Sequence, residues 1–346
     1  MKLNKRLLAL LMASAMSVGM LAGCGGKSDP DTANTDTAGA GDSAAASDIS
    51  GKTFKVGICQ LAQHPALDAA TEGFMSKLKE LLEADGATVE FDNQNASGDA
   101  ATCSTIINSF VSGNVDMILA NATAPLQSAA SGTDKIPVLG TSVTDYATAL
   151  EMSDFSGTTG RNISGTSDLA PLDQQAAMLN EWFPDAKNVG LLYCSGEPNS
   201  AYQISVIKPE LEKLGYTCTE YSFADSNDLS AVVTKACQSS DVIYVPTDNT
   251  VADNTGIIAN VTIPAKVPVI AGEEGIASGC GVATLSISYK ELGEVTGQMA
   301  YDILAKGADI TTMPIQYAPN VTKKYNKTIC DQLGLTPPEG YTPIEG

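Results

Sequence analysis

The sequence predicts an α/β protein with two doubly wound, parallel-sheet lobes joined by a hinge of several strands. Three observations lead to this class. The run 116–123 (DMILANAT) returns as 241–248 (DVIYVPTD), and the run 136–141 (IPVLGT) returns as 267–272 (VPVIAG). Each run is apolar and ends at small or polar residues, as a strand buried on both faces does beside a ligand crevice. Apolar runs also alternate with amphipathic segments, so we expect two lobes whose crevices face each other.

The N-terminal segment has the pattern of a bacterial lipoprotein signal. Lys2, Lys5 and Arg6 precede an apolar stretch over 7–21, which is too short and too rich in small residues to span a bilayer. Small residues then lead to Cys24, which we expect to become the lipid-modified first residue of the mature chain. The alternative is an ordinary secretory signal in which this cysteine is incidental.

The predicted organisation has a signal peptide over 1–23 and a flexible tether over 24–51. Gly, Ser, Ala, Thr and Asp dominate the tether, which has too few large apolar residues to fold. The boundaries that we predict for the two lobes are as follows: residues 52–162 with 289–312 form lobe one, and residues 163–288 with 313–346 form lobe two.

In lobe one the apolar periodicity predicts alternating strands and helices. Leu67, Phe74 and Leu78 share one face of a predicted helix, which gives that segment its apolar side. The predicted strands are 54–59, 89–91, 115–119 and 137–140, and the predicted helices are 65–84 and 100–112. This rhythm predicts a parallel sheet with right-handed crossovers.

A polar run over 158–168 interrupts the rhythm, and we interpret it as the first crossing between the lobes. A further helix over 289–305 is predicted to return to lobe one, and the tail from 315 to cross back. Several crossings restrict the motion of the lobes to opening and closing. The predicted helices of lobe two are 172–183, 201–214, 228–237 and 251–263, and its predicted strands are 189–193, 218–223, 242–245, 267–270 and 282–287.

Composition excludes several functions. With a net charge of −20, the chain is not expected to have the positively charged surface that binds nucleic acid. The same charge disfavours direct binding to an anionic lipid surface. The eight cysteines include no Cys-x-x-Cys pair, and His64 is the only histidine, so we predict no metal site and no cofactor. Cys59 and Cys194 end apolar strands and are expected to be buried thiols. A disulfide among the other five cysteines of the folded part stays open.

The folded part contains no motif of an enzyme: no Gly-x-Ser-x-Gly elbow, no His-Glu-x-x-His pair and no glycine-rich dinucleotide fingerprint. We therefore predict a binding protein. A hydrolase would have to work through His64, which stands just before Pro65 at the start of a predicted helix. At that position His64 suits capping of the helix or contact with a ligand.

Polar residues follow the predicted strand ends in both lobes, where free backbone N–H groups and helix dipoles favour an anion such as a carboxylate. Taken singly, these residues are equally typical of helix caps. Acidic residues gather in lobe two, where Asp248 above all is expected to pair with a buried ammonium group. The predicted ligand-binding residues are Gln60, Asn121, Thr123, Thr141, Ser142, Ser195, Glu197, Asn199, Ser200, Asp248, Asn249, Glu273 and Glu274.

These residues resemble a known family. From roughly Thr53 to Pro338 the chain is similar to the solute-binding lipoproteins of ABC importers in the tryptophan/tyrosine-binding group, which have the type I periplasmic-binding-protein fold. The resemblance rests on Gln60 with the segment 64–68 (HPALD), and on the segments 196–200 (GEPNS), 246–249 (PTDN), 272–275 (GEEG) and 289–293 (YKELG).

The resemblance implies a monomeric, lipid-anchored protein on the extracytoplasmic face of the membrane. It implies that the protein captures a free, aromatic amino acid and delivers it to a permease with its ATPase. The cleft residues that it implies are Gln60, Thr123, Ser142, Asn199, Ser200, Asp248 and Asn249. The alternatives are capture of another small solute, such as a nucleoside, a sugar or another amino acid, and a role as a ligand sensor or surface adhesin.

Overall fold

The computed structural model describes residues 48–318 and 320–344, which belong to one compact unit. The predicted signal peptide, Cys24 and most of the predicted tether lie outside these residues. Within the described part of the chain, no helix has the length and apolar character needed to cross a membrane.

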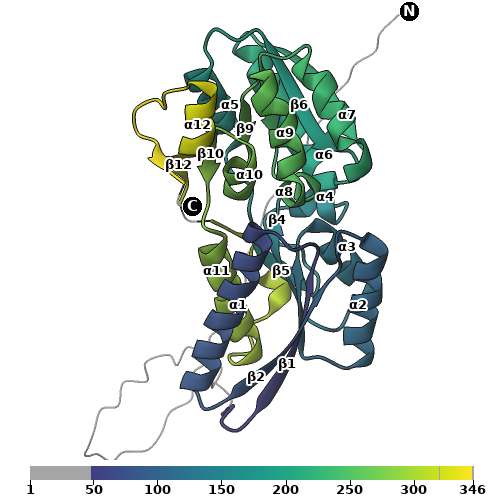
Figure 1. Cartoon of the computed structure of the whole chain (residues 1–346). Helices are drawn as coiled ribbons and strands as arrows, with labels where there is room; N and C mark the ends of the chain where they lie inside the picture. The colour runs from purple at the N-terminus through teal and green to yellow at the C-terminus, as the bar shows by residue number, and fades with distance from the viewer. Residues whose placement is uncertain (1–47, 319, 345–346) are drawn as a thin grey trace, which may run out of the picture. The chain divides into compact units, whose positions relative to one another are not determined.

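Lobe one is built on a six-stranded sheet with the order β11-β5-β4-β3-β1-β2, in which every pairing is parallel. Figure 1 shows it with α1 and α11 at one side and α2 and α3 at the other. Its strands are β1 (Thr53–Gln60), β2 (Thr88–Asn95), β3 (Met117–Asn121), β4 (Val138–Val143), β5 (Ile163–Ser167) and β11 (Gln316–Tyr317).

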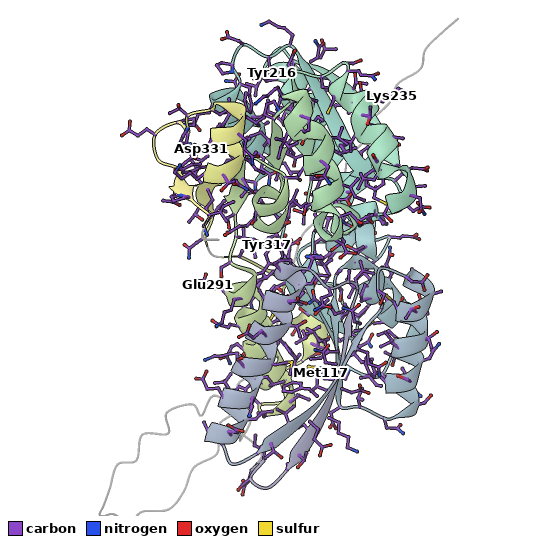
Figure 2. The ribbon with its side chains drawn as sticks, viewed as in Figure 1. Met117, Tyr216, Lys235, Glu291, Tyr317 and Asp331 are labelled. Carbon is purple, nitrogen blue, oxygen red and sulfur yellow. The ribbon has the colours of Figure 1, made fainter. Side chains whose placement is uncertain are left out.

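Helices cover both faces of this sheet, as the alternating pattern predicted. One core lies between the sheet and the pair α1 and α11, and a second lies beneath α2 and α3. Met117 lies inside this lobe, whereas Lys235 and Asp331 lie on the exterior of lobe two (Figure 2). The helices of lobe one are α1 (Pro65–Ala84), α2 (Ala100–Ser112), α3 (Thr123–Gly132), α4 (Tyr146–Ala149), α11 (Tyr289–Leu304) and the 3-10 turn η1 (Ile310–Thr312).

Glycines allow α1 and α11 to pack closely against each other. A Cβ atom on Gly297 would stand 2.8 Å from the carbonyl oxygen of Phe74, and one on Gly293 would stand 2.9 Å from the backbone nitrogen of the same residue. A Cβ atom on Gly73 would likewise collide with the backbone of Lys290. Real Cβ atoms do not approach backbone so closely, so side chains at these positions would force the helices apart.

Lobe two is built on a seven-stranded sheet with the order β13-β12-β10-β9-β8-β6-β7. All of its pairings are parallel except that of β10 with β12. Its strands are β6 (Asn188–Cys194), β7 (Thr217–Phe223), β8 (Val242–Val245), β9 (Val269–Ala271), β10 (Ala283–Ser286), β12 (Thr322–Tyr325) and β13 (Thr342–Pro343).

Helices again cover both faces of this sheet, over two separate apolar cores. The single helix predicted over 251–263 is two helices, because the backbone of Asn254 leaves the helical conformation between them. The helices of lobe two are α5 (Leu172–Trp182), α6 (Pro198–Lys213), α7 (Ser226–Cys237), α8 (Asn249–Asp253), α9 (Thr255–Ala265), α10 (Glu274–Gly279) and α12 (Lys327–Leu333).

The chain passes between the lobes at three places: between β5 and α5, between β10 and α11, and between β11 and β12. The predicted boundaries of lobe two at residues 163 and 313 are therefore wrong. Strand β5 and strand β11 pair with each other in the sheet of lobe one. As predicted, the helix that begins at Tyr289 returns to pack on lobe one.

The polar run over 158–168 was wrongly interpreted as a crossing because β5 is a buried strand without an apolar pattern. Its hydroxyl groups are satisfied internally: Ser164 donates to the carbonyl oxygen of Met313, and Thr166 bonds to Thr141 and Thr296. Gly165 has a φ of +145°, and a Cβ atom there would collide with the backbone of β4. The strand is polar and glycine-containing because it packs tightly against its neighbour.

Candidate functional site

Three of the predicted site residues lie side by side at one edge of the lobe-one sheet. The strand register aligns Gln60 with Asn121, and Asn121 with Thr141. Gln60 forms its hydrogen bonds within lobe one. Its Oε1 accepts a hydrogen bond from Thr71 at 2.7 Å, and its Nε2 donates to Asp68 at 2.7 Å. The Nδ2 of Asn121 also donates to Thr71, at 2.9 Å. These side chains therefore brace the strand ends.

Other polar atoms at this edge lack partners. Nδ1 of His64, Oδ1 of Asn121 and Oγ of Ser142 are buried without a hydrogen bond among the described residues. Ser142 has a φ of +53°, an uncommon conformation for a residue with a side chain. Thr123 is buried at the start of α3. Unpaired buried polar atoms are destabilising, and their concentration at one sheet edge is typical of a binding site.

In lobe two the carboxylate of Glu197 holds together the loops that follow β6 and β8. Its Oε2 accepts from the backbone nitrogen of Asn249 at 3.0 Å and from Nδ2 of Asn249 at 2.8 Å. Its Oε1 accepts from the backbone nitrogen and the hydroxyl of Thr250, at 2.8 and 2.7 Å. Nδ2 of Asn199 also donates to Glu197, at 3.1 Å. Glu197 is thus a structural clamp beneath the site.

Asp248 is buried and forms hydrogen bonds with the backbone of lobe two. Its carboxylate accepts from the backbone nitrogens of Cys194 at 2.7 Å and Val251 at 2.9 Å, and Ser200 also contacts it. Burial raises the pKa of Asp248 to about 8, and the charge of Glu197 adds to this effect. Ser195, by contrast, is exposed and donates to the carbonyl oxygen of Phe223 at 3.0 Å.

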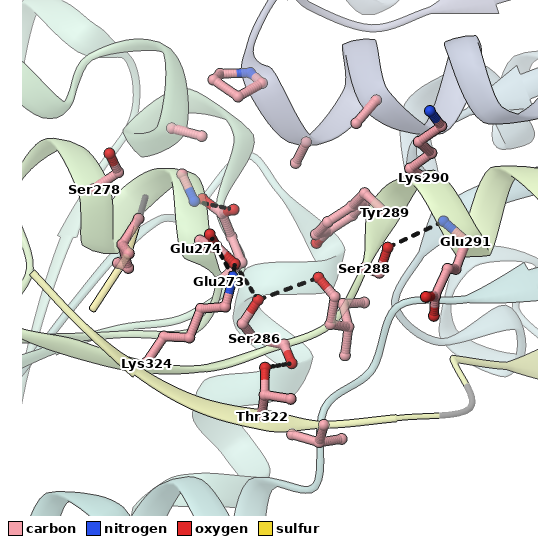
Figure 3. Close-up of a pocket in the computed structure, with 18 of the residues that line it drawn as sticks. Glu273, Glu274, Ser278, Ser286, Ser288, Tyr289, Lys290, Glu291, Thr322 and Lys324 are labelled. Carbon is pink, nitrogen blue, oxygen red and sulfur yellow. Dashed lines mark hydrogen bonds and ion pairs between the residues drawn. The ribbon is translucent and has the colours of Figure 1, made fainter. Parts of the chain in front are cut away.

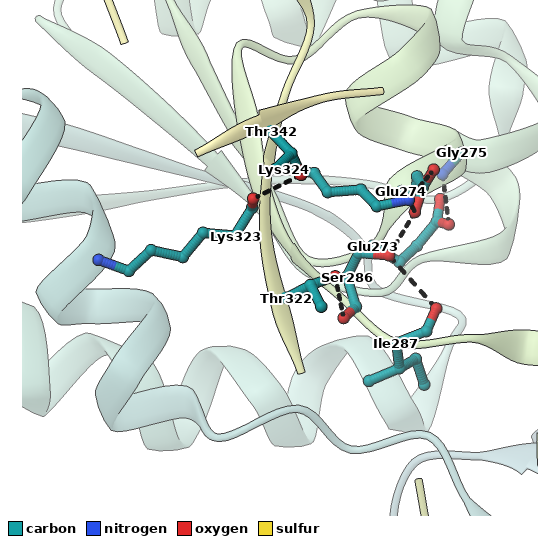
Figure 4. Close-up of polar contacts among 9 residues, drawn as sticks. All are labelled: Glu273, Glu274, Gly275, Ser286, Ile287, Thr322, Lys323, Lys324 and Thr342. Atoms are coloured by element: carbon teal, nitrogen blue, oxygen red, sulfur yellow. Dashed lines mark hydrogen bonds and ion pairs between the residues drawn. The ribbon is translucent and has the colours of Figure 1, made fainter. Parts of the chain in front are cut away.

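Glu273 and Glu274 follow β9 and differ in their electrostatic partners. Glu273 is 3% exposed and caps α10 by accepting from the backbone nitrogens of Gly275 and Ile276. Burial raises the pKa of Glu273 to about 7. Glu274 instead forms an ion pair with Lys324 at 2.9 Å and accepts from Ser286 (Figure 4). Its charge is therefore compensated within the protein.

One carboxylate of the site, Asp168, was not predicted from the sequence. It follows β5, and its Oδ1 and Oδ2 accept from the hydroxyls of Thr144 at 3.1 Å and Tyr289 at 2.9 Å. Burial raises the pKa of Asp168 above its ordinary value. The same signal used elsewhere, a polar residue after a buried strand, applies here. It was missed because β5 itself was not predicted.

A cavity of about 980 Å³ opens between the lobes beside the hinge. Its lining comes from α1 of lobe one, from α10 of lobe two and from the crossing before α11. Figure 3 shows Glu273, Glu274 and Ser286 on one side of it and Ser288, Tyr289 and Lys290 on the other. Of the predicted site residues, only Glu273 and Glu274 line this cavity.

The cavity and the polar strand ends adjoin at Glu273 and Tyr289. Both residues line the cavity. Burial and the charges of Asp168 and Glu273 raise the pKa of Tyr289, and the hydroxyl of Tyr289 donates a hydrogen bond to Asp168. Apolar surface from Pro65, Ala66 and Ile287 covers another part of the wall. The site therefore combines buried negative charge with an apolar wall and a tyrosine ring.

The buried carboxylates have no cationic partner in the described residues. Asp168, Asp248 and Glu273 take part in none of the ion pairs found there. A buried carboxylate without a cationic partner is stabilised either by taking up a proton or by binding a positively charged ligand. The arrangement is suited to binding a cationic group in an enclosed space.

Comparison with known proteins finds clear similarities. The sequence model of the family described as ABC transporter substrate-binding protein matches residues 55–342. A protein named tyrosine-binding protein, from Clostridioides difficile, is 32% identical over 316 residues, which cover 90% of this chain and 87% of the relative.

Two solved structures are similar over most of the chain. One, from Streptococcus pneumoniae, was solved in complex with L-tryptophan; it has 30% identity and a TM-score of 0.78, and the match covers 85% of this chain and all of that one. The other is the ligand-free, open structure of a substrate-binding protein with adhesive properties from Clostridium difficile. It has 33% identity and a TM-score of 0.64, and the match covers 84% of this chain and 99% of that one.

The two TM-scores differ although the identities do not. Sequence identity is nearly the same in both comparisons, yet the structure is more similar to the protein solved with L-tryptophan than to the open one.

Proposed function

Because the chain belongs to the family of ABC transporter substrate-binding proteins, we propose that it captures a free aromatic amino acid between its lobes and delivers it to a membrane permease. Its two lobes have the type I periplasmic-binding-protein fold, and the family is a transporter component and not an enzyme. The relatives named for tyrosine and solved with L-tryptophan support an aromatic ligand.

The observation that carries the proposal is the uncompensated carboxylate of Glu273 at the cavity wall. An α-ammonium group in the cavity would ionise this carboxylate and pair with it, and Asp168 lies behind it through Tyr289. The residues Pro65, Ala66, Ala69 and Ile287 offer apolar contact to an aromatic ring.

The carboxylate of an amino acid would need donors of a different kind. His64 precedes α1 without capping it, and the backbone N–H groups of Ala66 and Leu67 have no acceptor among the described residues. Ala66 also lines the cavity. Free N–H groups at the start of a helix of this length suit a carboxylate.

The predicted site residues all belong to the proposed site, but they have different roles. We place Glu273, Asp168 and Tyr289 nearest the ammonium group, and Ser142 and Thr123 at the opposite edge. Residues bonded mainly within one lobe act by holding the loops in position, although Asn249 also bonds to His64 of lobe one; they are Gln60, Asn121, Thr141, Ser195, Glu197, Asn199, Ser200, Asp248, Asn249 and Glu274.

A thermal-shift and calorimetry screen against amino acids, nucleosides and sugars tests the ligand class. We expect L-tryptophan or L-tyrosine to stabilise the fold by about 2.7 kcal/mol at a hundredfold excess over Kd, because a ligand that binds only the folded state adds RT ln(1 + [L]/Kd). A response to nucleosides or sugars with none to any amino acid would contradict the proposed ligand while leaving the family assignment intact.

We also propose that Cys24 carries a lipid anchor and that residues 24–51 tether a monomeric binding domain to the extracytoplasmic face of the membrane. Replacing Cys24 with alanine is expected to release the protein from the membrane fraction, because the acidic body has no affinity of its own for anionic lipid. Fractionation with immunoblotting measures this. An equal membrane-bound share for both proteins would rule out the anchor.

A further inference from the structure

A hydrogen bond joins the two lobes at their strand-end loops. His64 precedes α1 in lobe one, and Asn249 begins α8 in lobe two. Nε2 of His64 lies 3.3 Å from Oδ1 of Asn249. Since the two residues belong to different lobes, opening of the lobes would separate them and break this bond.

The other hydrogen bonds of Asn249 determine which atom is the donor in its bond with His64. Nδ2 of Asn249 donates to Glu197 at 2.8 Å, so the amide oxygen of Asn249 must face His64. Glu197 also holds the backbone of Asn249 and both donors of Thr250, which prevents the amide from turning over. An amide oxygen only accepts, so Nε2 of His64 carries the hydrogen.

The surroundings of the second ring nitrogen of His64 favour the neutral ring. Nδ1 is buried and has no hydrogen-bond partner among the described residues, and the side chain as a whole is 6% exposed. A proton on Nδ1 would create a buried, charged donor without an acceptor, which is strongly unfavourable. With Nε2 already protonated, the closed arrangement therefore selects the neutral ring.

We propose that His64, Asn249 and Glu197 form a latch that holds the lobes closed while the His64 ring is neutral and lets them open when the ring is protonated. Glu197 orients the amide, Asn249 accepts the bond, and His64 supplies the hydrogen. The latch uses none of the groups assigned to the ligand's ammonium, and it deepens the proposed function only by coupling capture to pH.

The charged groups that face His64 act against the effect of burial. Asp68 on its own helix, Glu197 before α6 and Asp253 at the end of α8 each favour the protonated ring, as does the bond to Asn249. Burial is the largest influence, and the pKa of His64 is lowered as a result.

The direction of the pH effect follows from this lowered pKa. In the open arrangement the ring meets water and has an ordinary pKa of about 6.5. The closed arrangement binds the proton less tightly, so the latch is fully effective above about pH 6.5 and weakens as the pH falls below that value, by up to about tenfold per pH unit. The effect levels off once the pH is below the pKa of the closed arrangement.

His64 is the only histidine in the chain, so its titration can be followed by NMR on untagged protein without any assignment. We expect a pKa below the ordinary value in the presence of L-tryptophan. In Asn249→Ala we expect the pKa to rise towards the ordinary value, because the lobes open and the ring becomes hydrated. Asn227→Ala removes an amide that bonds only within lobe two, at 2.9 Å to Asp225, and should leave the titration unchanged.

The sign of the change in Asn249→Ala separates a latch from a passive contact. If the lobes stayed closed, loss of a bond that raises the pKa would lower it further. A pKa that falls or does not change in this variant overturns the latch, as does an ordinary pKa in the wild type with and without L-tryptophan.

Affinity measurements provide a second test. Asn249→Ala removes the side-chain bonds to Glu197 and to His64, and loss of the one between the lobes should weaken amino-acid binding by about 2- to 12-fold at pH 7.5. His64→Gln keeps an N–H donor that does not titrate, so its affinity should change less between pH 7.5 and pH 5.5 than the affinity of the wild type does. Equal pH profiles for His64→Gln and the wild type would contradict the proposal. If no amino acid binds, the NMR comparison of Asn249→Ala with the wild type still decides on the latch.

Discussion

Replacing Glu273 with glutamine is expected to weaken amino-acid binding by more than a hundredfold, or about 3 kcal/mol. The substitution removes the charge but leaves an oxygen that can still cap α10. The ligand's ammonium group would then be enclosed beside Asp168 alone, which is itself partly satisfied by two hydroxyl groups. Isothermal titration calorimetry with L-tryptophan and L-tyrosine measures the change.

The adjacent Glu274 provides a matched control. It lines the same cavity and carries the same group, but it already has a cationic partner in Lys324. We expect Glu274→Gln to change the affinity only slightly, because its charge is not available to the ligand. Comparable losses in both variants would contradict the role given to Glu273.

The stability of the unliganded variant shows whether a loss of binding is a folding defect. Burial raises the pKa of Glu273 to about 7, so the folded protein holds this proton more tightly than the unfolded chain does. This contribution is complete below the ordinary pKa of a glutamate and is lost as the pH rises through 7. Glu273→Gln should therefore be at least as stable as the wild type at pH 8, even though it binds poorly.

Replacing Gly293 with alanine is expected to destabilise the protein by about 3 kcal/mol, the upper part of the range for overpacking. The added Cβ atom would meet the backbone of Ala70 and Phe74 on α1, and backbone cannot move aside as the end of a side chain can. Thermal unfolding with and without ligand measures the loss. Binding should weaken as well, since Tyr289 begins the displaced helix.

Gly256 tests the same substitution where there is room. It lies in α9, is exposed and would place no Cβ atom within 4 Å of another group. Alanine has a higher helix propensity than glycine, so Gly256→Ala should stabilise the protein by up to about 1 kcal/mol. If Gly293→Ala behaved in the same way, the close packing of α1 and α11 would not be what holds lobe one together.

Most strands and helices were predictable because burial on both faces leaves long apolar runs, as in the strands that end at Asn121 and Val245. The helices that begin at Pro65 and Ala100 were predicted with the bounds that the structure has. Strand β5 could not be found in this way, since Ser164, Gly165 and Thr166 are buried through hydrogen bonds and tight backbone packing. That error concealed Asp168 and displaced the boundary between the lobes.

The sequence could not show which residues of the site bind the ligand and which cap helices or hold loops. Capping residues and ligand-binding residues have the same composition, and only the partners of each atom distinguish them. Glu197 and Glu274 are both saturated by neighbours from distant parts of the chain, through Thr250 and Lys324. Long-range pairings of this kind leave no local pattern, so periodicity and motif spacing could not reveal them.

The late position of α11 and β11 in the chain governs the order in which the lobes can fold. Lobe one receives its last helix and its last strand only after most of lobe two, over residues 172–287, has been synthesised. Until then the apolar side of α1, including Phe74 and Leu78, has no helix beside it. The part of lobe two over residues 172–287 can therefore begin to form while lobe one is still incomplete, and lobe two in turn receives its last elements, β12, α12 and β13, only after β11.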